Sequence, residues 1–217
     1  MRTRERIIEE ARLLFNEQGY GAVTTAALAA HCGIAEGNLW YHFKTRSALL
    51  DAIGERYAAA VDARLELTPR DDPLAGYVRL LAALMAEFRE FRFLYRDQQS
   101  YGEHADTIRA RAPDWLVRSF LQFEAHLAAL VDAGLLDWPR HRLRDLATNA
   151  TIILRYGLEH SRELGAPTGT GSGAVRRTLA QHLTLFEHQL TEDAARTLRQ
   201  AVAAIGDEAL AAPEAAG

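Results

Sequence analysis

The sequence predicts an all-α protein: an N-terminal three-helix helix-turn-helix head followed by a larger helical domain. Three observations predict this class. Apolar residues recur at helical spacing along most of the chain. The stretch from Thr24 to Lys44 has the order of two short helices joined by a glycine turn. No run shows the alternation that favours a strand. With 217 residues, 48% of them hydrophobic, the chain can bury a core in each part.

The head is predicted to begin with an amphipathic helix over residues 4–18, because its apolar side chains form one stripe. Thr24 or Thr25 is expected to cap the next helix, since a hydroxyl accepts hydrogen bonds from free backbone N–H groups there. Gly33 stands at the turn, where a positive φ costs glycine least. The residues spaced to face a shared core are Leu28, Ile34 and Leu39.

The second helix of a helix-turn-helix lies in the DNA major groove. At its exposed start, we expect Glu36, Gly37 and Asn38 to approach base edges. Phosphate contacts position a protein without reading sequence, and side chains with suitable donors surround this helix. The residues expected to make them are Thr25, Tyr41, His42, Lys44 and Arg46. Trp40 and Phe43 are expected to pack inside the head.

Thr45 is expected to cap a long connector helix that continues to about Leu67. The polar, proline-flanked segment that follows predicts a domain boundary. The predicted parts are a DNA-binding domain at 1–48, a connector helix at 49–67, a larger helical domain at 73–210 and a disordered tail at 211–217.

The larger domain reads as helical throughout. Pro113 is expected to start a helix, because proline is tolerated in a first turn, and Gly134 to end it. Residues 165–173 are rich in glycine and predict a flexible loop. The helices predicted in this domain span 73–97, 104–111, 113–133, 142–164, 174–190 and 191–210.

Composition favours a cytoplasmic protein. The one cysteine, Cys32, excludes an intrachain disulfide and is expected to be buried. No segment offers the roughly 20 apolar residues that span a bilayer, so we expect no membrane partner. The net charge is −4, and residues 1–50 hold six basic and five acidic side chains. Because the head is near neutral, DNA binding depends on where its cations lie.

An enzyme is not expected. The chain has no nucleotide-binding glycine motif, nucleophile elbow or zinc motif, so we expect no catalytic residue, metal or cofactor. Two other functions stay open. One is a helix-turn-helix module that binds proteins, which Lys44 and Arg46 speak against because both are cations near the recognition helix. The other is a small-molecule-binding protein without a specific DNA target.

Residues 1–60 resemble the N-terminal domain of the TetR family of bacterial transcriptional regulators. The resemblance rests on Phe15, Gly19, Tyr20, Thr25, Leu28, Ala29, Gly33, Ile34, Gly37, Asn38, Leu39, Tyr41, His42, Phe43, Lys44 and Leu49. The chain departs from the family pattern at three positions. Trp40 stands where the family usually has tyrosine, and Arg46 and Ser47 stand where it often has lysine and then glutamate.

The resemblance implies a ligand-responsive homodimeric repressor, in which the helical domain at 73–210 is the ligand-binding and dimerisation domain. Its dimer would bind double-stranded DNA at a palindromic operator, and an unknown small-molecule effector would release it. The residues expected at the ligand are Phe88, Phe91, Tyr95, Trp115, Phe120, Phe123, His126, Asn149 and Arg155. Those expected at the dimer interface are Ile152, Tyr156, Leu179, Leu183, Phe186 and Leu190. Core packing within one subunit predicts the same apolar spacing for both sets.

Overall fold

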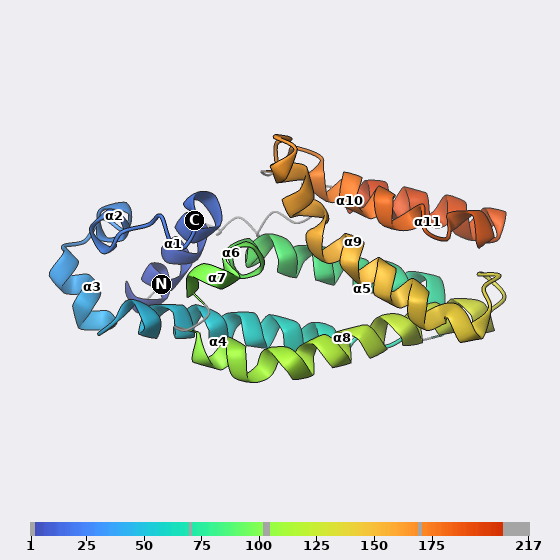
Figure 1. Ribbon diagram of the computed structural model, residues 1–217, viewed down its shortest axis with the longest axis horizontal. Coiled ribbons are helices and arrows are strands. Elements are labelled where there is room, and N and C mark those ends of the chain that lie inside the picture. Colours follow the sequence, from blue (N-terminus) through green and yellow to red (C-terminus); the bar gives the residue numbers. More distant parts are fainter. Residues whose placement is uncertain (1–2, 70, 102–104, 169–170, 206–217) are drawn as a thin grey trace. The chain divides into compact units, whose positions relative to one another are not determined.

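The computed structural model describes residues 3–69, 71–101, 105–168 and 171–205. Over these residues the chain is helical and has no strand, which confirms the predicted all-α class (Figure 1). The chain divides into two compact units. Unit 1 consists of Met1–Ala63 and Glu87–Leu116, and unit 2 consists of Arg64–Ala86 and Val117–Gly217. In the described part of the chain, no helix is both long and apolar enough to span a membrane.

Unit 1 opens with the predicted head. Its helices are α1 (Thr3–Gln18), α2 (Thr25–His31), α3 (Glu36–His42) and the start of α4 (Arg46–Leu65) (Figure 1). The Thr24 hydroxyl caps α2 by accepting from the Ala27 amide at 3.1 Å. The Thr45 hydroxyl caps α4 by accepting from the Ala48 amide at 3.0 Å. Gly33 has a φ of 63° at the turn between α2 and α3. Both caps and the glycine turn therefore follow the sequence prediction.

The predicted single helix over 73–97 is wrong, because the structure divides it. Helix α5 (Pro73–Glu90) ends before Phe91, and α6 (Arg92–Arg96) follows, then α7 (Gln98–Tyr101). The side chain of Asn16 occupies the break: its Nδ2 donates to the Glu90 carbonyl at 2.7 Å, and its Oδ1 accepts from the Phe93 amide at 2.9 Å. One amide from α1 thus satisfies backbone groups that a continuous helix would pair internally.

The predicted boundary at Pro113 is also wrong, because α8 (Asp106–Asp132) runs through it. Proline in a helix interior normally breaks or kinks the helix. Here α4 holds the turns on both sides: Asp62 accepts from Arg111 Nη2 at 2.5 Å and from Trp115 Nε1 at 3.1 Å. Of the helix predicted over 104–111, residue 104 lies outside the described residues.

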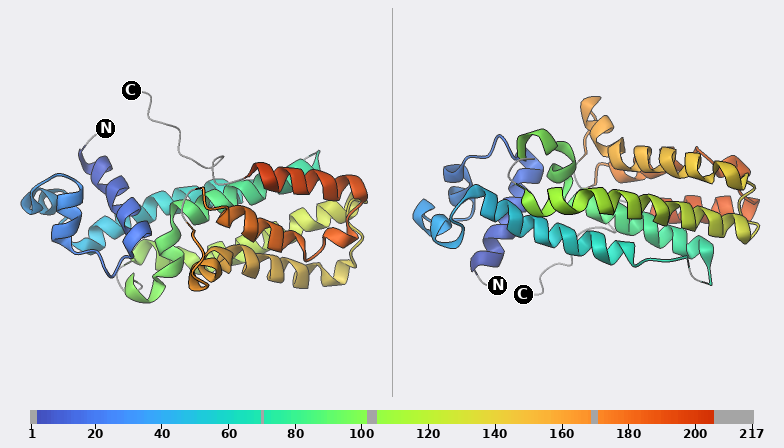
Figure 2. Two further views of the ribbon diagram at one scale, coloured as in Figure 1. Left: turned by 90° about the horizontal axis from the view of Figure 1, so that it is seen from above. Right: turned by 60° about the horizontal axis from the view of Figure 1, so that its bottom comes forward.

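The C-terminal helices of unit 2 follow a short 3-10 turn (Arg140–Arg142). They are α9 (Leu143–Glu163), α10 (Ala174–Leu183) and α11 (Glu192–Ala204), with another 3-10 turn (Glu187–Gln189) before α11. Helix α10 lies beside both α9 and α11 (Figure 2). The prediction that one helix continues to residue 190 is wrong, since Leu190 instead forms an antiparallel bridge with Leu136. The predicted tail at 211–217 lies outside the described residues.

The core of unit 2 contains polar side chains among aromatic rings. Tyr77 of α5 is fully buried; its hydroxyl lies 2.7 Å from Nε2 of His182, and its ring contacts Phe123 and Phe186. Burial lowers the pKa of His182 to about 3, so this histidine is neutral in the folded protein.

Candidate nucleic-acid interface

Helix α3 presents nearly all of its side chains to solvent. The three consecutive residues Glu36, Gly37 and Asn38 are exposed, as predicted, and Tyr41 is 76% exposed. Only Leu39 is buried, and it anchors the helix to the core of the head. The Tyr41 ring therefore contributes little to the core of the head. The helix is therefore held by one apolar residue and leaves its polar face free.

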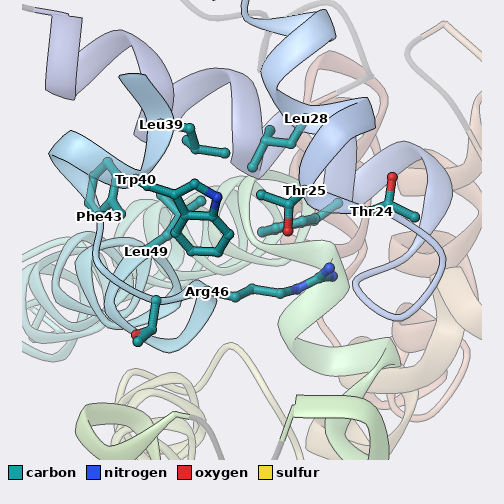
Figure 3. Close-up of a pocket in the computed structure, with 10 residues that line it drawn as sticks. Thr24, Thr25, Leu28, Leu39, Trp40, Phe43, Arg46 and Leu49 are labelled. Carbon is teal, nitrogen blue, oxygen red and sulfur yellow. The ribbon is translucent and has the colours of Figure 1, made fainter. Parts of the chain in front are cut away.

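A pocket opens between α2, α3 and the start of α4 (Figure 3). Its apolar lining includes Leu28, Leu39, Phe43 and Leu49, and Thr24 and Thr25 border it. Trp40 also lines this pocket and is 37% exposed. The prediction that Trp40 packs inside the head is wrong, whereas Phe43 is buried as predicted. Because neighbouring residues of a helix point in different directions, Trp40 does not share the buried position of Leu39 and its ring is partly exposed at the pocket.

The predicted phosphate-binding residues differ in their surroundings. Lys44 is exposed, and its Nζ lies 6.0 Å from the centre of the Tyr41 ring. His42 is half-buried and packs edge-on against Tyr41, while Thr25 is half-buried at the pocket. These four side chains lie on or next to the exposed face of α3, at α2 and at the α3–α4 junction. Their contacts with DNA stay a prediction.

Arg46 points inward instead. Its Nη1 donates to the Val23 carbonyl, and its Nη2 donates to the Tyr20 carbonyl. Its guanidinium lies 4.2 Å from the centre of the Tyr20 ring. The structure thus places this cation in the head, between α4 and the segment that precedes α2, and not on the surface beside Lys44. We therefore leave Arg46 out of the proposed DNA contacts.

The predicted ligand-binding residues are divided between the two units. Phe88, Phe91, Tyr95 and Trp115 belong to unit 1, and the other predicted residues belong to unit 2. In unit 1, Phe91, Tyr95 and Trp115 pack edge-on around Tyr57 of α4. Sequence reasoning missed this central tyrosine. The sequence does hold one signal, because the acidic Glu87 lies in an apolar run just before Phe88. A carboxylate buried there requires hydrogen-bond donors nearby, and in the structure Glu87 is 4% exposed and accepts from Tyr95.

In unit 2, Phe123 and His126 are buried. Nδ1 of His126 donates to the Gln122 carbonyl at 2.8 Å, so Nε2 is the unprotonated nitrogen of the neutral ring. This Nε2 is buried and has no partner among the described residues. Burial lowers the pKa of His126. The remaining predicted residues are less enclosed: Phe120 is half-buried beneath Arg144, Arg155 is half-buried and Asn149 is exposed.

The predicted dimer residues divide by burial. Leu179, Leu183 and Phe186 lie in the core of their own subunit, because α10 packs on α9. They are not available to a second subunit, and Leu190 is half-buried at the bridge to Leu136. Ile152 and Tyr156 of α9 are 52% and 53% exposed. They are one helical turn apart and share a face of α9.

Two family profiles match the chain. One, described as "Bacterial regulatory proteins, tetR family", matches residues 7–53, and the other, described as "Bacterial transcriptional repressor" (TetR), matches residues 56–198. The tetracycline repressor protein class C of Escherichia coli is 35% identical over 131 residues, which are 60% of this chain and 54% of that protein. The matched region thus spans about half the length of that relative.

Two further comparisons also find bacterial transcriptional regulators. The HTH-type transcriptional regulator UidR of Escherichia coli (strain K12) is 39% identical over 51 residues, 24% of this chain and 26% of that one. A solved structure of a TetR-family transcriptional regulator from Marinobacter aquaeolei VT8 has the same fold, with a TM-score of 0.76 and 24% identity. The alignment covers 95% of this chain and 100% of that chain.

Proposed function

The chain belongs to the TetR family, and on this premise we propose that it is a DNA-binding transcriptional regulator, a homodimeric repressor released from a palindromic operator by a small-molecule effector. The observation that carries the proposal is the exposed polar face of α3. Glu36 and Asn38 offer hydrogen-bonding groups to base edges, and Gly37 allows close backbone approach. Lys44 and Tyr41 supply phosphate contacts beside them.

The DNA-binding part is tested by selecting bound fragments from a random duplex pool at a stated salt concentration. We expect one palindromic sequence to be enriched. Asn38→Ala should weaken binding to that sequence about 5- to 150-fold, since a good base contact is worth about 1–3 kcal/mol. The matched control is Arg196→Ala, an exposed residue of α11. Sequence-independent binding alone would favour a helix-turn-helix without a specific DNA target.

The proposed dimer uses the exposed apolar face of α9. Two copies related by a two-fold axis would pair Ile152 and Tyr156 with the same residues of the other subunit. A carboxylate there would be desolvated, so Ile152→Asp is expected to yield monomers in sedimentation equilibrium. Leu121→Asp, at an equally exposed apolar residue of α8, is the control and should leave the dimer intact. The opposite pattern would move the interface to α8.

The proposed effector contact is His126. Because its ring is neutral and its buried Nε2 can only accept, we propose that the effector carries an O–H or N–H donor and an apolar body that packs on Phe123. A library of neutral compounds screened by thermal shift should yield ligands that also weaken operator binding, since coupling between two sites is reciprocal. His126→Phe should abolish the shift and preserve operator binding without ligand. Ligands that stabilise both proteins equally would exclude this contact.

A further inference from the structure

Arg46 is the first residue of α4, and both terminal nitrogens of its guanidinium are hydrogen-bonded within unit 1. Both terminal nitrogens donate to backbone carbonyls, one of Val23 and one of Tyr20. The group also lies 4.2 Å from the centre of the Tyr20 ring and 5.3 Å from that of Phe15. Nε is buried and has no partner among the described residues. Both terminal nitrogens are thus directed at the backbone of the head, and the side chain as a whole is half-buried.

The two carbonyls belong to the segment that leads into α2. This segment ends at Thr24, which caps α2, and Thr25 follows as the first residue of the helix. Figure 3 shows the Arg46 side chain extending from α4 along the pocket toward the start of α2. By binding two carbonyls three residues apart, one planar group fixes where α2 begins relative to α4.

We propose that Arg46 is a positioning residue for DNA binding and not a phosphate contact. It holds the Tyr20–Val23 segment, and through it the start of α2, where Thr25 can meet the DNA backbone beside α3. The inference rests on DNA binding by the head and is independent of the proposed dimer and effector. Lys44, two residues earlier, provides the comparison, because it is an exposed cation and is predicted to contact a phosphate directly.

The role requires the guanidinium shape as well as its charge. A guanidinium presents several N–H donors in a fixed plane and stacks on aromatic rings, whereas lysine ends in one compact ammonium. Lysine at this position would keep the positive charge, but its single nitrogen could not reproduce the geometry in which two separate nitrogens bind the two carbonyls beside Tyr20. A phosphate contact has no such requirement, because an ammonium serves it as a point charge. The two roles therefore predict different results for Arg46→Lys.

The experiment measures affinity for one short duplex as a function of salt, with wild type, Arg46→Lys, Arg46→Gln and Lys44→Gln. The slope of log affinity against log salt is negative, and each phosphate contact that is lost reduces its magnitude by about 0.9. We expect Lys44→Gln to reduce the magnitude of the slope by that amount. Arg46→Lys and Arg46→Gln should both weaken binding about ten- to a hundredfold, as loss of charge-assisted hydrogen bonds implies, and leave the slope unchanged.

If the magnitude of the slope is about 0.9 smaller in Arg46→Gln, and Arg46→Lys binds nearly as tightly as wild type, the proposal is overturned in favour of a phosphate contact. Hydrogen exchange on the free protein gives a second readout that needs no DNA. Exchange at the amides of residues 20–27 should quicken in both Arg46 variants and stay unchanged in Lys44→Gln. Unchanged protection of this segment in Arg46→Lys would also contradict the proposal, and a circular dichroism spectrum checks that each variant is folded.

Discussion

The hydroxyl of Tyr57 lies 2.7 Å from the hydroxyl of Tyr95, and the Tyr95 hydroxyl donates to Oε1 of Glu87 at 2.5 Å. Because Tyr95 has one proton and gives it to the carboxylate, Tyr57 must be the donor between the two tyrosines. Burial, together with the neighbouring Glu87 carboxylate, raises the pKa of Tyr95 well above its usual value. These two hydrogen bonds link α4 to α5 and α6 inside unit 1.

Tyr95→Phe is expected to lower the free energy of unfolding by about 1–3 kcal/mol, because it removes a donor from a buried carboxylate. Tyr57→Phe is the matched variant and should cost about 0.5–1.5 kcal/mol, since it removes a bond between two neutral hydroxyls. Urea unfolding of the two variants measures the difference. A larger loss in Tyr57→Phe than in Tyr95→Phe would show that the carboxylate does not depend on this donor.

Asn16 is predicted to hold the break between α5 and α6 through both ends of its amide. Asn16→Leu should remove both contacts and destabilise the fold by about 1–3 kcal/mol. Asn16→Asp keeps an acceptor for the Phe93 amide but places a carboxylate oxygen against the Glu90 carbonyl. Hydrogen exchange at Phe93 distinguishes them: protection should persist in the aspartate variant and be lost in the leucine variant. Equal protection in both would mean that the break forms without Asn16.

Gly157 of α9 is predicted to be required by its contact with α10. A Cβ at this position would lie 2.5 Å from Cγ2 and 2.8 Å from Oγ1 of Thr178, which is closer than real side chains approach. Gly157→Ala should therefore destabilise unit 2 by about 1–3 kcal/mol, in spite of the better helix propensity of alanine. Adding Thr178→Ala removes the clashing atoms and should restore part of the loss. Additive losses in the double variant, measured by urea unfolding, would refute the contact.

The pH dependence of stability is predicted to include a term from His182. The folded pKa is about 3, and an unfolded histidine has a pKa of about 6.5. Between these values the unfolded chain binds a proton that the folded chain does not, so stability falls as the pH is lowered from about 6.5 toward 3. The loss approaches about 1.4 kcal/mol for each pH unit.

The control is the double variant Tyr77→Phe with His182→Leu, which removes the histidine without leaving the Tyr77 hydroxyl unpaired. His126 titrates in both proteins, so the difference between their unfolding free energies isolates His182. We expect that difference to change steadily between about pH 6.5 and 4. Parallel stability curves in this range would mean that His182 is protonated in the folded protein.

The features that depend on neighbouring residues could be predicted from the order of amino acids alone. The caps at Thr24 and Thr45, the turn at Gly33 and the exposed face of α3 each follow from local backbone chemistry and the helical period. The same local signals were sufficient to indicate a helix-turn-helix head and its family.

Other features depend on contacts between residues far apart in the chain, and these could be seen only in the folded protein. Asn16 divides the α5–α6 stretch from 74 residues away, and Asp62 keeps α8 continuous past Pro113. Leu179 and Leu183 have the spacing of an interface but face their own core, because a helical stripe does not specify which partner covers it. Arg46 likewise carries the charge of a phosphate contact, and only the positions of two distant carbonyls direct it inward.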